Sequence, residues 1–212
     1  MKIQLALDRL TRDECFAILE QTEAHIDWIE VGTGVIKEYG MAIVREIKET
    51  FPHRTVVADM KTCDAGKHEA LQAFEAGADI TTVMAFSADQ TIADVLKVAK
   101  DKEKRVMIDL LGVTNPDRIA VIEELGADLV SLHYGKDMQK GGAMKLDLFS
   151  LTEGRKNLEV AVAGGISPDS LPEILRKSPS VVIVGSAVTK ADDKKQVVLK
   201  MRGVMDDYEN NH

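Results

Sequence analysis

Two carboxylates and a lysine stand close together in the segment VVADMKTCDAG, residues 56–66. Three apolar residues open the segment as in a buried β-strand, and Asp59, Lys61 and Asp64 then follow within six positions. Side chains alternate along a strand, so Asp59 and Lys61 should share one face, with Asp64 beyond the strand. The functional interpretation is a lysine whose orientation and charge are fixed by the two acids. A local ion pair followed by a helix cap would give the same pattern.

Glu30 interrupts WIEVG, an otherwise apolar segment at residues 28–32. A buried carboxylate without a partner is unfavourable, so Glu30 requires a cation or hydrogen-bond donors. Glu30 and Asp59 fall at the same level of consecutive predicted strands, and two carboxylates with substrate oxygens and water suit Mg²⁺. We therefore expect Glu30 and Asp59 to be metal ligands. The alternative is a structural ion pair between Glu30 and Lys61.

A histidine and two glycine segments end later strands. His133 closes SLH, and a lone histidine there is more often structural, but Asp59 and Lys61 on the opposing wall make proton transfer a plausible role. AGGIS and VGSAV place glycines after the last two predicted strands, where barrels usually bind phosphate through backbone amides. A tight turn is the simpler interpretation. We expect phosphate to bind at these residues: Gly164, Gly165, Gly185 and Ser186.

Eight short apolar runs, separated by segments of helical period, must position these residues. They cover residues 3–7, 28–32, 55–59, 80–84, 105–111, 129–133, 159–165 and 181–187. Most are continuous in Val, Ile and Leu, which is typical of parallel strands buried on both faces. Thr11 and Glu14 form a capping-box pattern, and EAGAD and ELGAD repeat one helix-to-strand connection with glycine as the cap.

Eight strand–helix units in 212 residues predict one domain over residues 1–212, an α/β protein with the (β/α)8 TIM-barrel fold. The rival is a doubly wound sheet, which usually has a glycine-rich loop where this chain has DRLTRDE. A barrel gathers the carboxyl ends of its strands at one mouth. Those ends include Asp8, Glu30, Asp59, Asp109 and His133, and only the fourth, TVMAFS, lacks a charged residue or a glycine.

Composition excludes several classes of function. The net charge is −8 with both signs mixed along the chain, which argues against binding nucleic acid. No apolar run approaches the ~18 residues of a membrane span. The N-terminal segment lacks the features of a signal peptide, and two cysteines make no disulfide or metal framework. A cytoplasmic location is the expectation.

The segments ADMKTCDAG, IEVGT, LALD, VAGGI and IVGSAV resemble the orotidine 5'-monophosphate decarboxylase superfamily over essentially the whole chain. Within it, the chain resembles first the 3-hexulose-6-phosphate synthases and second the 3-keto-L-gulonate-6-phosphate decarboxylases. The resemblance implies a Mg²⁺ site and a homodimer with active sites at the subunit interface. Orotidylate decarboxylases have a lysine at the end of the second strand, so Glu30 favours the metal enzymes. The implied roles are metal ligation by Glu30 and Asp59, substrate contact by Lys61 and Asp8, phosphate binding by Gly165, Gly185 and Ser186, and entry of Asp64 into the partner subunit's site.

The reaction implied by the resemblance depends on the fifth and sixth strands. The decarboxylases have Glu where this chain has Asp109, and Arg where it has Lys136. We therefore favour aldol condensation of D-ribulose 5-phosphate with formaldehyde to D-arabino-hex-3-ulose 6-phosphate through a metal-stabilised enediolate, with His133 as the base and Asp109 as its helper. The decarboxylase reaction is the alternative, although VGSAV fits neither group cleanly. A non-catalytic phosphosugar-binding barrel is a third, against which the combination of Glu30, Asp59 and Lys61 argues.

Overall fold

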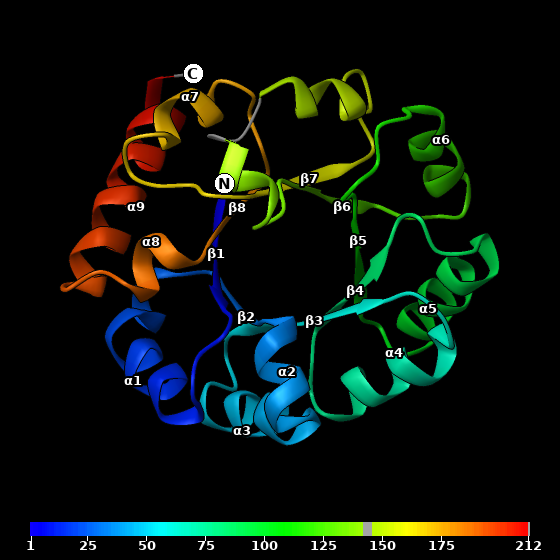
Figure 1. The fold of residues 1–212 in the computed structure, drawn as a ribbon, viewed down its shortest axis with the longest axis horizontal. Helices are drawn as coiled ribbons and strands as arrows, with labels where there is room; N and C mark the ends of the chain where they lie inside the picture. The colour runs from blue at the N-terminus through cyan, green and yellow to red at the C-terminus, as the bar shows by residue number, and fades with distance from the viewer. Residues whose placement is uncertain (142–145, 212) are drawn as a thin grey trace.

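The computed structural model describes residues 1–141 and 146–211, and within them eight parallel strands form a closed barrel (Figure 1). Each strand pairs with the next in the chain, and β1 pairs with β8 to close the barrel. The predicted (β/α)8 fold is thus confirmed. The strands are β1 (Lys2–Leu7), β2 (Trp28–Val31), β3 (Thr55–Thr62), β4 (Ile80–Met84), β5 (Arg105–Asp109), β6 (Leu129–His133), β7 (Glu159–Ala163) and β8 (Val181–Val184).

Helices surround the barrel as an outer layer (Figure 1). They are α1 (Arg12–Thr22), α2 (Thr33–Tyr39), α3 (Met41–Thr50), α4 (Gly66–Glu75), α5 (Asp89–Asp101), α6 (Asp117–Glu124), α7 (Leu171–Leu175), α8 (Ser186–Thr189) and α9 (Lys194–Asn211). Short 3₁₀ helices are η1 (Glu23–His25), η2 (Met138–Gly141) and η3 (Leu146–Thr152). In the parts of the chain that the structure describes, no helix is long and apolar enough to cross a membrane.

The strands are apolar on both faces because each face is covered. One face packs against the helices in the larger core, which includes Ile29 and Val56. The other face fills the barrel interior with a second cluster. Val57 belongs to this interior cluster, as the alternation along β3 predicts. Its members are Trp28, Val57, Ile80, Met107, Leu129, Ala161, Val181 and Ile183.

Local signals in the sequence form the expected structures. Thr11 and Glu14 make a reciprocal capping box at the start of α1. Gly77 and Gly126, in the repeated EAGAD and ELGAD segments, have φ values of 95° and 97°. A left-handed backbone is readily available to glycine, so these residues end α4 and α6 and direct the chain into β4 and β6.

Candidate active site

A cavity of about 670 Å³ opens at the carboxyl ends of the strands. Its volume suits a small organic ligand, and it lies where (β/α)8 enzymes place their active sites. Every predicted site residue except Asp64 lines this cavity. The lining residues that were predicted are Asp8, Glu30, Asp59, Lys61, Asp109, His133, Gly164, Gly165, Gly185 and Ser186. The barrel therefore brings together, in one cavity, residues that come from seven strands and the loops that follow them.

The cavity wall formed by β3 is not a regular strand. The register between β3 and β4 shifts between Ala58 and Thr62, and Lys61 has a left-handed backbone with φ of 47°. Such a conformation is uncommon for a residue with a side chain. It directs the Lys61 side chain into the cavity, where its Nζ lies 2.8 Å from Asp59 Oδ2 and 3.0 Å from Asp109 Oδ2.

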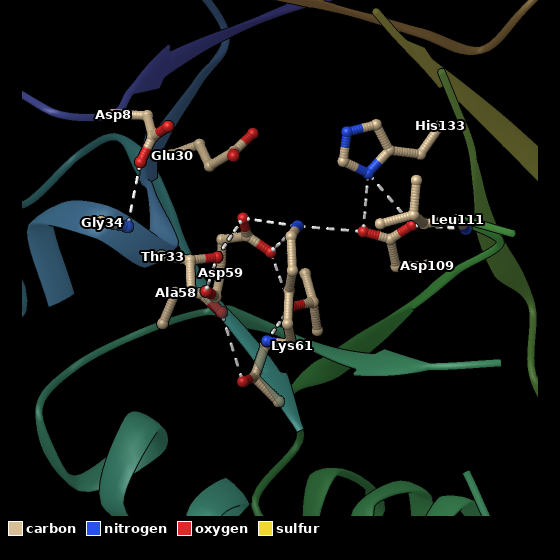
Figure 2. Close-up of polar contacts among 12 residues, drawn as sticks. Asp8, Glu30, Thr33, Gly34, Ala58, Asp59, Lys61, Asp109, Leu111 and His133 are labelled. Carbon is tan, nitrogen blue, oxygen red and sulfur yellow. Dashed lines mark hydrogen bonds and ion pairs between the residues drawn. The ribbon is translucent and has the colours of Figure 1, made fainter. Parts of the chain in front are cut away.

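The Lys61 ammonium lies between two carboxylates, Asp59 on one side and Asp109 on the other (Figure 2). Burial would lower the pKa of Lys61, but the charges of Asp59 and Asp109 outweigh burial and raise it. Lys61 thus remains a cation. The predicted alternative of an ion pair between Lys61 and Glu30 is wrong, because in the described residues the salt bridges of Lys61 go to Asp59 and Asp109.

Asp109 and His133 form a second pair, with His133 Nδ1 at 2.9 Å from Asp109 Oδ2. Burial would raise the pKa of Asp109, but the hydrogen bond with His133 and the charge of Lys61 lower it to about 2. The Leu111 N–H also donates to this carboxylate. An ionised carboxylate only accepts hydrogen bonds, so His133 Nδ1 must carry the proton that it shares with Asp109.

The other ring nitrogen of His133, Nε2, is therefore left without a proton when the ring is neutral. It points away from Asp109 (Figure 2), and His133 lines the cavity. Burial lowers the pKa of His133, but the hydrogen bond and charge of Asp109 outweigh burial and raise it. The pair has the geometry of a general base whose tautomer is fixed by an acid.

Glu30 is nearly buried, with 9% of its surface exposed. Its Oε2 accepts a 2.5 Å hydrogen bond from Gln4 Nε2. Burial, and next the negative charge of Asp59, raise the pKa of Glu30 to about 7. Gln4 Oε1 is buried and has no hydrogen-bond partner among the residues that the structure describes. A cation bound beside Glu30 would therefore reduce the repulsion between the Glu30 and Asp59 carboxylates. A cation or a polar ligand there could also give Gln4 Oε1 a partner.

The carboxylate oxygens of Glu30 and Asp59 fit a hard cation such as Mg²⁺, which prefers oxygen ligands. No cluster of three or more His, Cys, Asp or Glu suited to a metal occurs among residues 1–141 and 146–211. The protein would thus contribute the two carboxylates, and substrate oxygens and water would complete the coordination, as the sequence predicts. Glu30 and Asp59 as ligands remain a prediction.

Three uncharged residues that the sequence interpretation missed support the acids. Thr33 Oγ1 donates to Asp59 Oδ2 at 2.8 Å, Thr82 Oγ1 donates to Asp59 Oδ1 at 2.8 Å, and Gln4 holds Glu30. Gln4 could have been found, because a polar residue at the inward parity of the apolar run IQLAL resembles Glu30 in WIEVG. Thr82 carries no such signal, since threonine is common in strands.

Asp8 and several glycines, among them Gly34 and Gly164, also line the cavity. Asp8 Oδ1 accepts from the Gly34 N–H at 2.9 Å, and a Cβ at Gly34 would lie 2.6 Å from this oxygen. At Gly164, φ is 131° and a Cβ would lie 2.5 Å from Tyr134 O. These glycines therefore allow close backbone approach. Both the tight-turn interpretation and a phosphate site agree with this geometry, and phosphate binding remains a prediction.

Asp64 lies outside the cavity. It is exposed, between the end of β3 and α4, which begins at Gly66. The structure thus does not bring Asp64 together with the other predicted catalytic residues of its own chain. Its predicted role in the site of a partner subunit remains a prediction.

A closed parallel barrel with acids, a lysine and a histidine at the carboxyl ends of its strands is the arrangement of (β/α)8-barrel enzymes. Comparison with known proteins identifies the family. The chain belongs to the orotidine 5'-phosphate decarboxylase / HUMPS family, whose model matches residues 1–201. The predicted superfamily is confirmed.

Individual members of the family show which enzymes the chain is similar to in sequence and structure. A 3-hexulose-6-phosphate synthase from Bacillus subtilis (strain 168) is 39% identical over 204 residues, which are 95% of this chain and 97% of that protein. The structure of 3-hexulose-6-phosphate synthase from Salmonella typhimurium has a TM-score of 0.95 and 38% identity, covering 98% of this chain and 100% of that one. A 3-keto-L-gulonate-6-phosphate decarboxylase from Vibrio cholerae O1 biovar El Tor str. N16961 has a TM-score of 0.89 and 28% identity, covering 98% of each chain. The chain is thus an enzyme of the lyase type.

Proposed function

We propose that this chain condenses D-ribulose 5-phosphate with formaldehyde to give D-arabino-hex-3-ulose 6-phosphate. The observation that carries the proposal is the Asp109–His133 pair, in which Nε2 points away from Asp109 (Figure 2) and His133 lines a cavity that also holds the Lys61 ammonium. Such an arrangement can remove a proton beside a carbonyl while a cation stabilises the negative charge that develops on oxygen. The similarity to 3-hexulose-6-phosphate synthases supports the choice of substrates.

In the proposed reaction, His133 Nε2 takes a proton from C1 of ribulose 5-phosphate, and the electron pair of the C–H bond enters an enediolate. Carbon 1 then attacks the carbon of formaldehyde and forms a C–C bond. The aldehyde oxygen receives a proton, which His133 can return, so the base is regenerated. Asp109 keeps the imidazole in the required tautomer throughout, because its carboxylate holds the proton on Nδ1.

The substrate is held at its two ends in this proposal. The loops after β7 and β8 would bind the phosphate through the backbone at Gly164, Gly165, Gly185 and Ser186, all of which line the cavity. Asp8 lines the cavity, where its Oδ1 accepts from the Gly34 N–H and its Oδ2 pairs with exposed Arg9, and it would accept a further hydrogen bond from a sugar hydroxyl. These contacts would orient carbon 1 toward His133.

We propose that Glu30 and Asp59 hold Mg²⁺. When bound, the metal would supply positive charge to substrate oxygens that become negative. The residues of this chain prepare the site: Gln4 fixes Glu30, and two threonine hydroxyls fix the carboxylate of Asp59. Binding would also remove the repulsion between Glu30 and Asp59 that raises the pKa of Glu30.

A homodimer with shared active sites is part of the proposal. Asp64 is exposed in the loop between β3 and α4, so a second copy could receive it. A cytoplasmic location is proposed as well, supported by the two free thiols of Cys15 and Cys63.

The test compares kcat/KM for ribulose 5-phosphate with formaldehyde against kcat/KM for 3-keto-L-gulonate 6-phosphate. We expect the condensation to be faster, because Lys136 is exposed and donates to Gln139 instead of offering the fixed fork of an arginine. A preference for the gulonate substrate would replace the proposal with the decarboxylase. Binding of ribulose 5-phosphate without turnover of either substrate would leave the non-catalytic barrel.

A further inference from the structure

Strand β4 contributes a buried hydroxyl to the site, although its sequence ends without a charged residue or a glycine. Thr82 is 4% exposed and lines the cavity. Its Oγ1 donates to Asp59 Oδ1 at 2.8 Å and accepts from the backbone N–H of Lys61 at 2.9 Å. One hydroxyl thus contacts both residues of β3 that face the cavity.

The contact with Lys61 falls at the irregular point of β3. There the register against β4 shifts, and the Lys61 backbone adopts its left-handed conformation. A strained backbone persists only where surrounding contacts hold it. Thr82 supplies such a contact, because it accepts the Lys61 N–H in place of a regular backbone partner at that position.

The contact with Asp59 follows from the same hydroxyl. A threonine hydroxyl has one proton to donate and can accept through its lone pairs. Since the Lys61 N–H occupies an acceptor position, the proton is directed to the Asp59 carboxylate. The orientation of Asp59 is therefore linked to the backbone that aims Lys61 between Asp59 and Asp109.

We propose that Thr82 is a positioning residue that sets the orientation of Asp59 and the direction of Lys61 together. This inference rests on the proposed function, in which Asp59 is a metal ligand and Lys61 contacts substrate. Thr82 would act through Asp59 and Lys61, the two residues that its hydroxyl contacts. Its loss should weaken metal binding and slow turnover more than it weakens substrate binding.

The neighbouring Thr81 offers a matched control. It is also β-branched, lies on the same strand and is 1% exposed, but its hydroxyl contacts Ala58 O at 3.3 Å. It does not line the cavity. Thr81→Val and Thr82→Val thus remove the same chemical group from opposite faces of β4, and only the second change reaches the site.

The experiment measures the dissociation constant of Mn²⁺, used as a paramagnetic probe in place of Mg²⁺, together with kcat and KM for ribulose 5-phosphate. Removal of a residue that orients a metal ligand typically costs about 10- to 100-fold in metal affinity or activity. Thr82→Val should therefore weaken Mn²⁺ binding about 10-fold and lower kcat at least as much, with a smaller change in KM. Thr82→Ser, which keeps the hydroxyl, should recover most of both losses, and Thr81→Val should match the wild type.

Equal Mn²⁺ affinity and kcat in the two valine variants would overturn the proposal, as would a wild type that binds no Mn²⁺. If the wild type binds Mn²⁺ but turns over neither substrate, the proposed function fails, and the Mn²⁺ comparison still decides the role of Thr82. Thr82→Ala, which places no additional methyl group beside Asp59, gives the same comparison if Thr82→Val does not fold.

Discussion

Glu30 has a buried carboxylate that the fold accommodates at a cost in stability, and glutamine at this position would remove that cost. Glutamine is close in size and can still accept the hydrogen bond from Gln4. It has no charge to repel Asp59. We expect Glu30→Gln to make the metal-free protein more stable at neutral and alkaline pH while it abolishes turnover.

The size of the effect follows from the pKa of Glu30, which burial and Asp59 raise from an ordinary 4.5 to about 7. Between these values the folded state binds more protons than the unfolded state, so stability falls as pH rises. The stabilising contribution of the neutral acid is complete below pH 4.5 and is lost as pH rises through about 7. At about 1.4 kcal/mol for each tenfold change, the whole shift corresponds to about 3 kcal/mol.

Urea unfolding in EDTA at several pH values measures this effect. The stability advantage of Glu30→Gln over the wild type should grow by about 2–3 kcal/mol between pH 5 and pH 8. Glu20→Gln, on an exposed position of α1, is the matched control and should follow the wild type. Parallel pH profiles for the wild type and Glu30→Gln would refute the argument that burial and Asp59 raise the pKa of Glu30.

A second set of unfolding curves adds Mg²⁺. A ligand that binds only the folded state stabilises it by RT ln(1 + L/Kd), where L is the free ligand concentration, so the gain in stability grows with this concentration once it exceeds Kd. The wild type should gain stability, and Glu30→Gln should gain much less. The same gain in both proteins would remove Glu30 from the set of metal ligands, whatever its pKa.

The remaining predictions concern turnover. Asp59→Asn should abolish it, and excess EDTA should do so reversibly; full activity in either case would contradict the metal proposal. His133→Asn should stop exchange of the C1 proton of ribulose 5-phosphate with solvent deuterium, and Asp109→Asn should move the acid limb of kcat/KM to lower pH, because Asp109 raises the pKa of His133. Persistent exchange would mean that another group is the base. Mixing inactive Lys61→Ala and Asp64→Ala proteins should restore roughly a quarter of the activity through random pairing of subunits. No recovery after confirmed subunit exchange would return Asp64 to its own subunit.

The positions of the charged site residues were predictable because strand geometry is regular. Asp59 and Lys61 share a face by alternation, and both line the cavity. Asp109 and His133 end consecutive strands, and the register that places Asp109 opposite Ser131 brings His133 to hydrogen-bond distance. The pairing of adjacent parallel strands thus accounts for the Asp109–His133 contact, which the family resemblance implied.

The irregular features could not be predicted in the same way. Alternation alone would place Lys61 on a normal strand, yet its backbone is left-handed and its N–H bonds to Thr82. That conformation depends on a residue of another strand, and nothing in the sequence near Lys61 indicates it. Thr33 was missed for a related reason, because its contact with Asp59 arises only when α2 begins beside β3.

Charge balance in the cavity links the ion pairs to the proposed metal. Lys61 contacts Asp59 and Asp109, so Glu30 is the carboxylate that this ammonium leaves without a salt bridge in the described residues. Its only hydrogen bond there comes from the amide of Gln4, which cannot balance a negative charge. A divalent cation shared by Glu30 and Asp59 would supply that balance. It would also weaken the hold of Asp59 on Lys61, so that the ammonium becomes available to the oxygens of a bound sugar.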